Sequence, residues 1–150
     1  MYKQISQSWQ KNLSKNLGEI KKRAIIWRKE STLVRLNRPT RLDRARSFGY
    51  KAKMGFVTVR IKVGRGGMRK KRPDAGRRPK HLGTTKIKAA VSMQQVAERR
   101  VLKKFPNMSL LGSYFLYQDG KTSWFEIMLC DRNHPSTQND PNFGRSLHNN

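Results

Sequence analysis

Residues 38–83 carry sixteen lysines and arginines against only two acidic residues, Asp43 and Asp74. So many cations in one stretch of chain repel one another unless a polyanion lies among them. The same stretch holds seven of the eleven glycines, which let the backbone approach a partner closely where a Cβ would intervene. The rest of the chain is therefore expected to hold this stretch against a partner rich in phosphate groups.

The net charge of the whole chain narrows the class of partner. The charge is +25 and the pI is about 11.3, whereas solubility of a small domain requires a magnitude of only about 2–8. Nucleic acid is the first candidate partner, and an anionic membrane surface is the second. A membrane protein would need about 18 consecutive apolar residues or a long basic amphipathic helix, and the sequence has neither.

Length and composition indicate one domain with a small core. The chain has 150 residues, of which 35% are apolar, below the ~45–50% that is usual when glycine is included. A single cysteine, Cys130, excludes an intramolecular disulfide and is compatible with a reducing compartment. The N-terminus lacks an apolar run followed by a cleavage site, so no secretory signal is predicted and an intracellular protein is expected.

Two amphipathic helices are predicted at the N-terminus. Large apolar residues recur with helical spacing over residues 2–13, among them Trp9. A second helix, starting at Ser14 or Asn16, is expected to run through Trp27, with an acidic residue early and basic residues late, as the helix dipole favours. All three tryptophans of the chain lie on apolar faces and are predicted to be core residues.

A strand is predicted inside the basic stretch. From Val57 to Val63 the odd positions are all β-branched, whereas Arg60 and Lys62 alternate with them. The strand should turn its apolar face to the core and its cationic face away from it. Residues 64–85, which follow, show no periodicity and are predicted to form a long basic loop, mobile alone and ordered by a partner.

The best-defined helix begins after Ser92. Ser92 as the N-cap and Gln95 three residues later form a capping box, and an apolar face continues from there until Pro106 ends the helix. The basic residues of this helix lie largely off the apolar face and read as a solvated surface.

A β-hairpin is predicted over residues 109–130, because Asp119-Gly120 between two β-rich runs is the strongest short-range hairpin signal. A two-residue loop at this position pairs Gln118 with Lys121, Phe115 with Trp124 and Tyr114 with Phe125. The better core candidate is the face made of Leu110, Tyr114, Leu116, Phe125, Ile127 and Leu129. The N-terminal helices are expected to cover part of the opposite face, which carries Ser113, Phe115, Tyr117, Thr122, Trp124 and Glu126.

Three short segments carry further predictions. Ser31 or Thr32 is expected to cap one short helical turn before Pro39, residues 86–88 to form a brief strand, and residues 132–150 to form an irregular tail. The predicted fold class is α+β, a sandwich on a small, mainly antiparallel sheet. One domain, residues 1–150, is divided into N-terminal helices (1–37), a basic segment (38–55), an α+β core (56–131) and the tail (132–150).

No catalytic or metal site is predicted. The segment from Gly120 to Thr122 resembles the end of a P-loop, but Phe115 stands where a glycine is required and a strand follows instead of a helix. The three histidines are scattered, so no zinc site, cofactor or enzymatic activity is expected. Cys130 is interpreted as a small packing residue. Tyr50, and less so Phe48, is a candidate for stacking on unpaired bases, with a structural role as the alternative for each.

Several runs of sequence together resemble one known family, that of the archaeal and eukaryotic large-subunit ribosomal protein L15e. The resemblance lies in the basic run RPTRLDRARSFGYKAKMGFVTVRIKVGRGGMRKKRPDAGRRPKHLG, and continues in VAERR, in FPNMSLLGSYFLYQDGKTSWFEIMLCDRNHP, and in YKQISQSW and WRKE near the N-terminus. It covers roughly residues 2–141.

The resemblance implies a three-layer α+β fold, a non-enzymatic role in the cytoplasmic large ribosomal subunit, and binding to large-subunit ribosomal RNA among neighbouring ribosomal proteins. No membrane and no small-molecule substrate are implied. The family usually continues with a glycine-rich basic extension, so either the lineage has shortened this protein or the sequence is a fragment. An RNA- or DNA-binding accessory protein outside the ribosome would show the same charge. With the two cations of the predicted strand included, the candidate RNA-binding residues are Arg38, Arg41, Arg44, Arg46, Tyr50, Lys51, Lys53, Arg60, Lys62, Arg65, Arg69, Lys70, Lys71, Arg72, Arg77, Arg78 and Lys80.

Overall fold

The computed structural model describes residues 1–14, 18–67, 70–84 and 90–140 of the chain. At its centre lies a four-stranded antiparallel sheet with the strand order β1, β2, β4, β3. The strands are β1 (Leu33–Leu36), β2 (Phe56–Gly64), β3 (Met108–Gln118) and β4 (Thr122–Asp131). The α-helices of the described residues are α1 (Tyr2–Ser14), α2 (Gly18–Lys29), α3 (Leu42–Ser47), α4 (Met93–Lys104) and α5 (Pro135–Gln138). The predicted α+β fold on an antiparallel sheet is confirmed.

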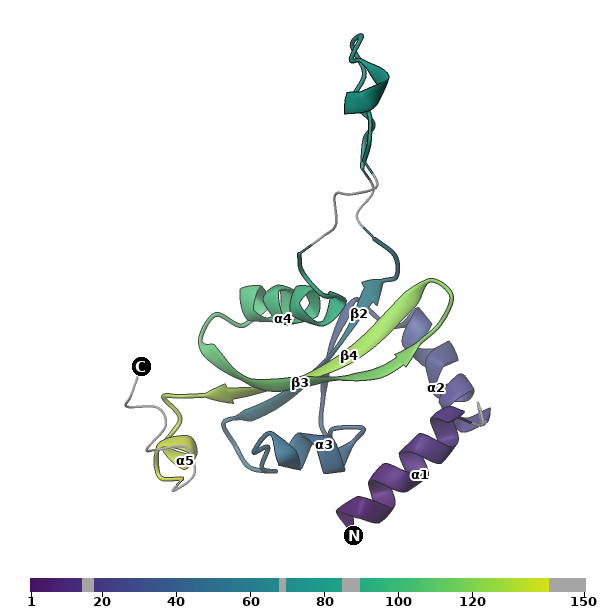
Figure 1. Ribbon diagram of the computed structural model, residues 1–150. Helices are drawn as coiled ribbons and strands as arrows, with labels where there is room; N and C mark the ends of the chain where they lie inside the picture. The colour runs from purple at the N-terminus through teal and green to yellow at the C-terminus, as the bar shows by residue number, and fades with distance from the viewer. Residues whose placement is uncertain (15–17, 68–69, 85–89, 141–150) are drawn as a thin grey trace.

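Helices cover both faces of the sheet, which gives three layers (Figure 1). On one face α4 contributes Ala97 to a core cluster with Val59 and other residues of β2 and β4. On the other face, toward α1, α2 and α3, Trp9 and Trp27 belong to a cluster that includes Trp124. All three tryptophans are buried, as predicted. Because β4 is an inner strand covered on both sides, any charged side chain on it needs a partner inside the protein.

The predicted hairpin is confirmed, but its turn lies one residue later than predicted. The chain reverses through Gly120 and Lys121, and the backbone N–H of Asp119 donates to the carbonyl oxygen of Thr122 at 2.9 Å. Oδ1 of Asp119 accepts hydrogen bonds from the backbone N–H groups of Lys121 (2.8 Å) and Thr122 (2.6 Å). The aspartate side chain therefore fixes the turn, as aspartates do in Asx turns.

Two bulges in β3 then shift its pairing with β4 back toward the predicted register by one residue each, so that Leu110 pairs with Leu129. Side chains alternate along a strand, so each shift of one residue exchanges the faces of the side chains beyond it. Tyr114 and Leu116 accordingly lie in the cluster with the tryptophans, whereas Phe125 lies in the cluster under α4. The predicted core face was therefore wrong for Tyr114 and Leu116. The observed pairs are Gln118 with Ser123, Phe115 with Phe125 and Tyr114 with Glu126.

Two short elements, β1 and α3, were not predicted from the sequence. The expected helical turn after Ser31 is wrong, because residues from Leu33 to Leu36 pair with β2 as an edge strand. The hydroxyl of Ser31 donates to the carbonyl oxygen of Leu33 at 2.7 Å instead of capping a helix. Helix α3 has no side-chain cap at its N-terminus and is held by tertiary packing, with Ala45 fully buried.

The other helices agree closely with the predictions from the sequence. Helices α1 and α2 confirm the two predicted N-terminal helices, and α4 begins with the predicted capping box, with Ser92 and Gln95 exchanging hydrogen bonds of 3.2 Å. The tail is less irregular than predicted, because α5 forms one helical turn. The expected strand at residues 86–88 and the end of the tail, from residue 141, lie outside the described residues.

Candidate nucleic-acid interface

Residues 65–84, named the arm here and described except for 68 and 69, project from the end of β2 away from the sheet and turn back toward it (Figure 1). The chain reverses at Ala75 and Gly76, whose φ angles of 61° and 71° have the signs that a type I′ turn requires. A 3-10 helix, Pro79–His81, follows on the returning side. Nζ of Lys70 donates to the carbonyl oxygen of Thr84 at 3.1 Å and joins the two sides of the arm.

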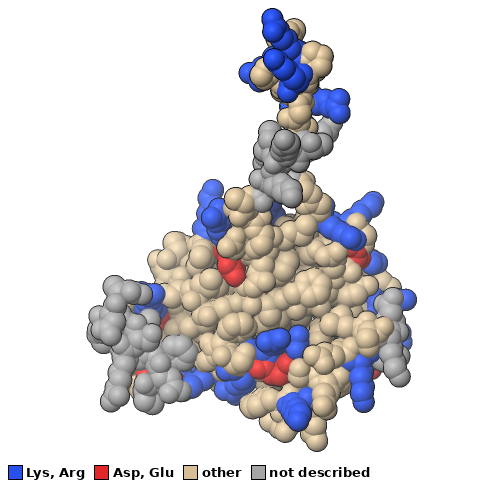
Figure 2. Space-filling model, in the orientation of Figure 1, with Lys and Arg blue, Asp and Glu red and all other residues tan. Residues whose placement is uncertain are grey.

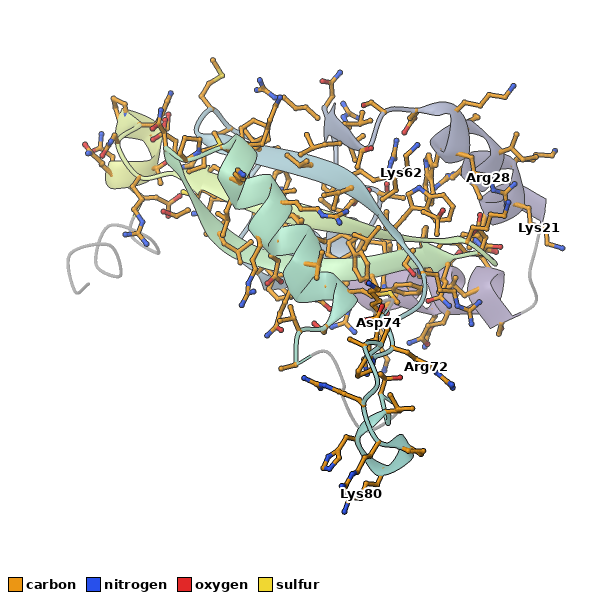
Figure 3. All side chains as sticks on the ribbon, turned by 90° about the horizontal axis from the view of Figure 1, so that it is seen from above. Lys21, Arg28, Lys62, Arg72, Asp74 and Lys80 are labelled. Atoms are coloured by element: carbon orange, nitrogen blue, oxygen red, sulfur yellow. The ribbon has the colours of Figure 1, made fainter. Side chains whose placement is uncertain are left out.

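The arm presents a dense group of cations (Figure 2), and Asp74 is the one acidic residue in its sequence. Asp74 lies 3.2 Å from Nζ of Lys71, but both side chains are exposed, so solvent screens this pair. Arg72 and Lys80 extend outward from the arm (Figure 3). Arg69 lies outside the described residues. Within the described part of the chain, no ion pair is formed by the other arm cations, which are Arg65, Lys70, Arg72, Arg77, Arg78 and Lys80.

The second predicted RNA-binding stretch, residues 38–55, is named the lead-in here and is fastened to the sheet by a buried carboxylate. The backbone N–H of Thr40 donates to Oε2 of Glu126 at 2.9 Å, and the hydroxyls of Thr40 and Tyr114 also donate to this carboxylate. The Tyr114 hydroxyl in turn accepts a hydrogen bond of 3.3 Å from the backbone N–H of Arg41. We call Glu126, Thr40, Tyr114 and the backbone N–H of Arg41 together the Glu126 clip.

Burial shifts the pKa values of the two titratable side chains of the Glu126 clip, Glu126 and Tyr114. Burial raises the pKa of Glu126 above its ordinary value, although the hydrogen bonds from Thr40 and Tyr114 and the positive charge of Arg60 oppose the change. Burial and then the negative charge of Glu126 raise the pKa of the Tyr114 hydroxyl. Tyr114 therefore keeps its proton and serves as a donor, which holds the lead-in against β4.

Part of the lead-in faces solvent. Arg38, Arg44 and Arg46 are exposed, and none of them forms an ion pair within the described residues. Arg44 lines a hollow of about 270 Å³ together with Phe48 and the half-exposed Phe115. This hollow places a guanidinium beside aromatic rings at the surface, which is a combination that single-stranded nucleic acid favours.

Two predicted RNA-binding residues of the lead-in lie inside the protein. The side chain of Arg41 is 10% exposed, pairs with Asp43 at 2.8 Å, and lies 5.6 Å from the ring centroid of Trp9. Tyr50 is buried and makes an edge-to-face contact with Phe56, with ring centroids 6.2 Å apart. Its burial favours the structural interpretation, and stacking on bases stays a prediction.

Lys51 and Lys53 brace the lead-in against the C-terminal part of the chain. Nζ of each lysine lies 2.7 Å from the buried carboxylate of Asp140, and Lys53 also donates to the carbonyl oxygen of Ser136 at 2.7 Å. Both lysine side chains remain about one third exposed, at 32% and 35%. These two predicted RNA contacts thus have partners of the opposite charge within the chain.

The cationic face predicted for β2 does not turn away from the core, and this prediction was wrong. Arg60 is buried, pairs with Glu30 at 2.6 Å, and lies 4.7 Å from the ring centroid of Trp27. Nζ of Lys62 donates to the carbonyl oxygens of Glu30 (2.6 Å) and Arg28 (3.1 Å) at the C-terminal end of α2. The two cations anchor α2 on the sheet, since cations favour the carbonyl end of a helix.

A protein-family model matches the part of the chain that contains the arm, the lead-in and the sheet. The family model described as Ribosomal L15, of the L15e type, matches residues 1–146. The chain belongs to the ribosomal L15e family. It is therefore a large-subunit ribosomal protein, and its family is structural rather than enzymatic. The match includes both basic segments and the hairpin.

A further basic cluster of this family member lies at the tip of the hairpin and was missed by the sequence analysis. Nε of Arg28 lies 2.8 Å from Oδ2 of Asp119, and Arg28, Lys62 and Lys121 line a hollow of about 410 Å³. Burial raises the pKa of Asp119, but the hydrogen bonds from Arg28 and from backbone N–H groups outweigh it and lower the pKa overall. No sequence signal joins these residues, because the chain brings them together from α2, β2 and the β3–β4 turn.

The described residues contain no group of three or more histidine, cysteine, aspartate or glutamate side chains that could hold a metal ion. None of the described helices is long and apolar enough to cross a membrane. Cys130 is buried at the end of β4, and burial raises the pKa of its thiol, which agrees with the predicted packing role and disfavours a reactive thiolate.

Proposed function

We propose that the protein binds large-subunit ribosomal RNA through its arm and through the exposed arginines of the lead-in, and so stabilises the folded RNA in the cytoplasmic large subunit. The observation that carries this proposal is the arm itself. Its cations project from the body, and in the described residues only Asp74 is available to neutralise them. Phosphates that enter between them relieve their repulsion and release counterions.

The predicted RNA-binding residues divide into two groups with different tasks. The first group consists of the arm cations with Arg38, Arg44 and Arg46; in the described residues its one ion pair is the solvent-screened pair of Lys71 with Asp74, and its other charges are left for phosphate groups. The second group, which includes Arg41, Lys51, Lys53, Arg60 and Lys62, uses its donors within the protein to fix the lead-in, α2 and the end of the chain. In this proposal the second group positions the first.

Selectivity is expected to come from the shape of the RNA more than from its sequence. The major groove of A-form RNA is too narrow for side chains, so duplex RNA is recognised by its backbone and its surface. A narrow arm with cations on both sides suits a junction where RNA helices converge and phosphates crowd together. Neighbouring ribosomal proteins are the further partners expected at such a junction.

Co-sedimentation tests the proposal. The full-length chain, added to large subunits that lack it, is expected to sediment with them in a high-salt gradient and to leave the ribosome-free fraction. A chain that remains in the ribosome-free fraction would contradict the proposal. A variant in which Arg77, Arg78 and Lys80 are replaced by alanine should be displaced at lower salt than the wild type, because each lost phosphate contact weakens the electrostatic part of binding.

A further inference from the structure

A cleft lined by both polar and apolar residues lies between α1 and α2, away from the arm. It has a volume of about 440 Å³, within the range of about 300–1,000 Å³ that is usual for small-ligand pockets. Gln4, Ser8 and Asn12 line it from α1, spaced four residues apart and therefore on one face of that helix. Ile5, Trp9 and Ile20 supply apolar walls.

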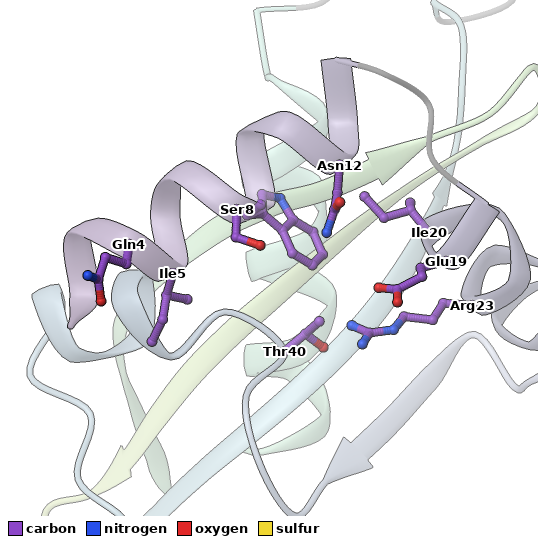
Figure 4. A pocket seen from close by; sticks show the side chains of 9 residues that line it. Gln4, Ile5, Ser8, Asn12, Glu19, Ile20, Arg23 and Thr40 are labelled. Carbon is purple, nitrogen blue, oxygen red and sulfur yellow. The ribbon is translucent and has the colours of Figure 1, made fainter.

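The opposite wall carries two unlike charges that do not pair with each other. Glu19 and Arg23 lie four residues apart on α2, a spacing that commonly gives an ion pair, yet neither forms one within the described residues. Figure 4 shows both side chains pointing toward the same space as Asn12 and Thr40. The cleft thus offers a free carboxylate acceptor and a free guanidinium donor side by side.

This pair of groups selects among possible occupants. A phosphate group is disfavoured because the carboxylate of Glu19 would repel it. An apolar peptide is disfavoured because it would cover the charged groups of Glu19 and Arg23 without giving them hydrogen bonds. A planar base that presents N–H donors on one edge and acceptors on the adjacent edge satisfies both groups at once.

We infer that the cleft between α1 and α2 binds the guanine base of an unpaired RNA nucleotide. Guanine presents N1–H and the N2 amino group to a carboxylate, while its O6 and N7 accept from a guanidinium, as in the common arginine–guanine contact. Adenine has an acceptor at N1 where guanine has N1–H, and an amino group where guanine has O6, so it cannot use both side chains in this way. The inference rests on the proposed RNA-binding function and adds base recognition to it.

Fluorescence anisotropy tests the inference with the full-length chain and short labelled oligouridylates that differ only in the central nucleotide. The RNA with central guanosine should bind about fivefold or more tightly than the RNA with central adenosine, since one bidentate base contact is worth about that factor. Central inosine, which lacks the N2 amino group, should bind more weakly than guanosine. The Glu19→Gln variant should lose the guanosine preference and no longer distinguish guanosine from inosine.

Lys22→Gln is the matched control, because Lys22 is exposed on the same helix and does not line the cleft. It should weaken binding of every oligonucleotide by a similar factor and keep the guanosine preference. Equal binding of guanosine and adenosine RNA by the wild type would overturn the inference while leaving the proposed function intact. Efficient competition by free guanosine monophosphate at the RNA concentration would reassign the cleft to a free nucleotide. Absence of binding to every one of these oligonucleotides would also overturn the inference, whereas the proposed function is tested separately by co-sedimentation with large subunits.

Discussion

Replacing Tyr114 by phenylalanine removes one buried hydroxyl and leaves the volume of the core almost unchanged. This hydroxyl donates to the carboxylate of Glu126 and accepts from the backbone N–H of Arg41. A hydrogen bond to a charged group contributes about 1.5–3 kcal/mol, and the long bond from Arg41 adds little to that. The free energy of unfolding should therefore fall by about 1.5–3 kcal/mol, because Glu126 loses a donor in a place that water does not reach.

Urea unfolding of the full-length chain, followed by circular dichroism, measures this loss. In a domain of this size it corresponds to a decrease in Tm of about 3–12 °C. The slope of unfolding free energy against urea should stay the same, since the exposed surface changes little. The matched control is Tyr117→Phe: the hydroxyl of Tyr117 makes no hydrogen bond within the described residues, and its ring stacks on Trp124. The control should lose less than about 0.5 kcal/mol. Equal losses in the two variants would refute the role assigned to the Glu126 clip.

Three further substitutions probe other contacts of the framework. Gly112→Ala should lower the free energy of unfolding by about 1–3 kcal/mol, because the added Cβ would lie 2.4 Å from the ring of Phe48. Gly120→Ala is the control, since a Cβ added there has no neighbouring atom within 4 Å, and the urea midpoints of the two variants are compared. Asp140→Asn should lower the Tm, because two lysines lose their carboxylate partner; since both are one third exposed, the loss should stay near 1 kcal/mol, and a larger one would contradict the screening argument. The pKa of Glu126 is raised in the folded state, so protonation of Glu126 contributes stability that is complete below pH 4.5 and is lost as pH rises through the folded pKa. Glu126→Gln should remove this dependence of the unfolding free energy on pH. An unchanged pH profile in the variant would show that another group causes the dependence.

The regular elements with strong local signals were predictable from the sequence, and those set by distant contacts were not. The capping box at Ser92 fixes the start of α4 through residues three apart, so the sequence contains the whole signal. The register of the hairpin depends instead on the side chain of Asp119 and on two bulges in β3. Strand β1 has four residues and exists because it pairs with β2, which no local pattern reveals.

The candidate interface shows the same division. The arm was predictable, because a long run of cations and glycines without periodicity has no place in a core. The internal cations were not, because their partners are distant in sequence: Arg60 pairs with Glu30, which follows α2, and Lys51 pairs with Asp140 near the other end of the chain. An arginine that alternates with valines in a strand has the same local pattern whether solvent or a helix covers that face.

The central claim is that the arm carries the electrostatic part of RNA binding. Filter binding of the full-length chain to purified large-subunit ribosomal RNA over a salt series tests it most directly, with wild type compared to a variant in which Arg72, Arg77, Arg78 and Lys80 are alanine. A second variant, with lysine at the three arginine positions, keeps the charge and should keep the salt dependence. In the alanine variant the slope of log affinity against log salt should become shallower by about 3, since each lost phosphate contact removes about 0.7–0.9. An unchanged slope in a folded alanine variant would contradict the account.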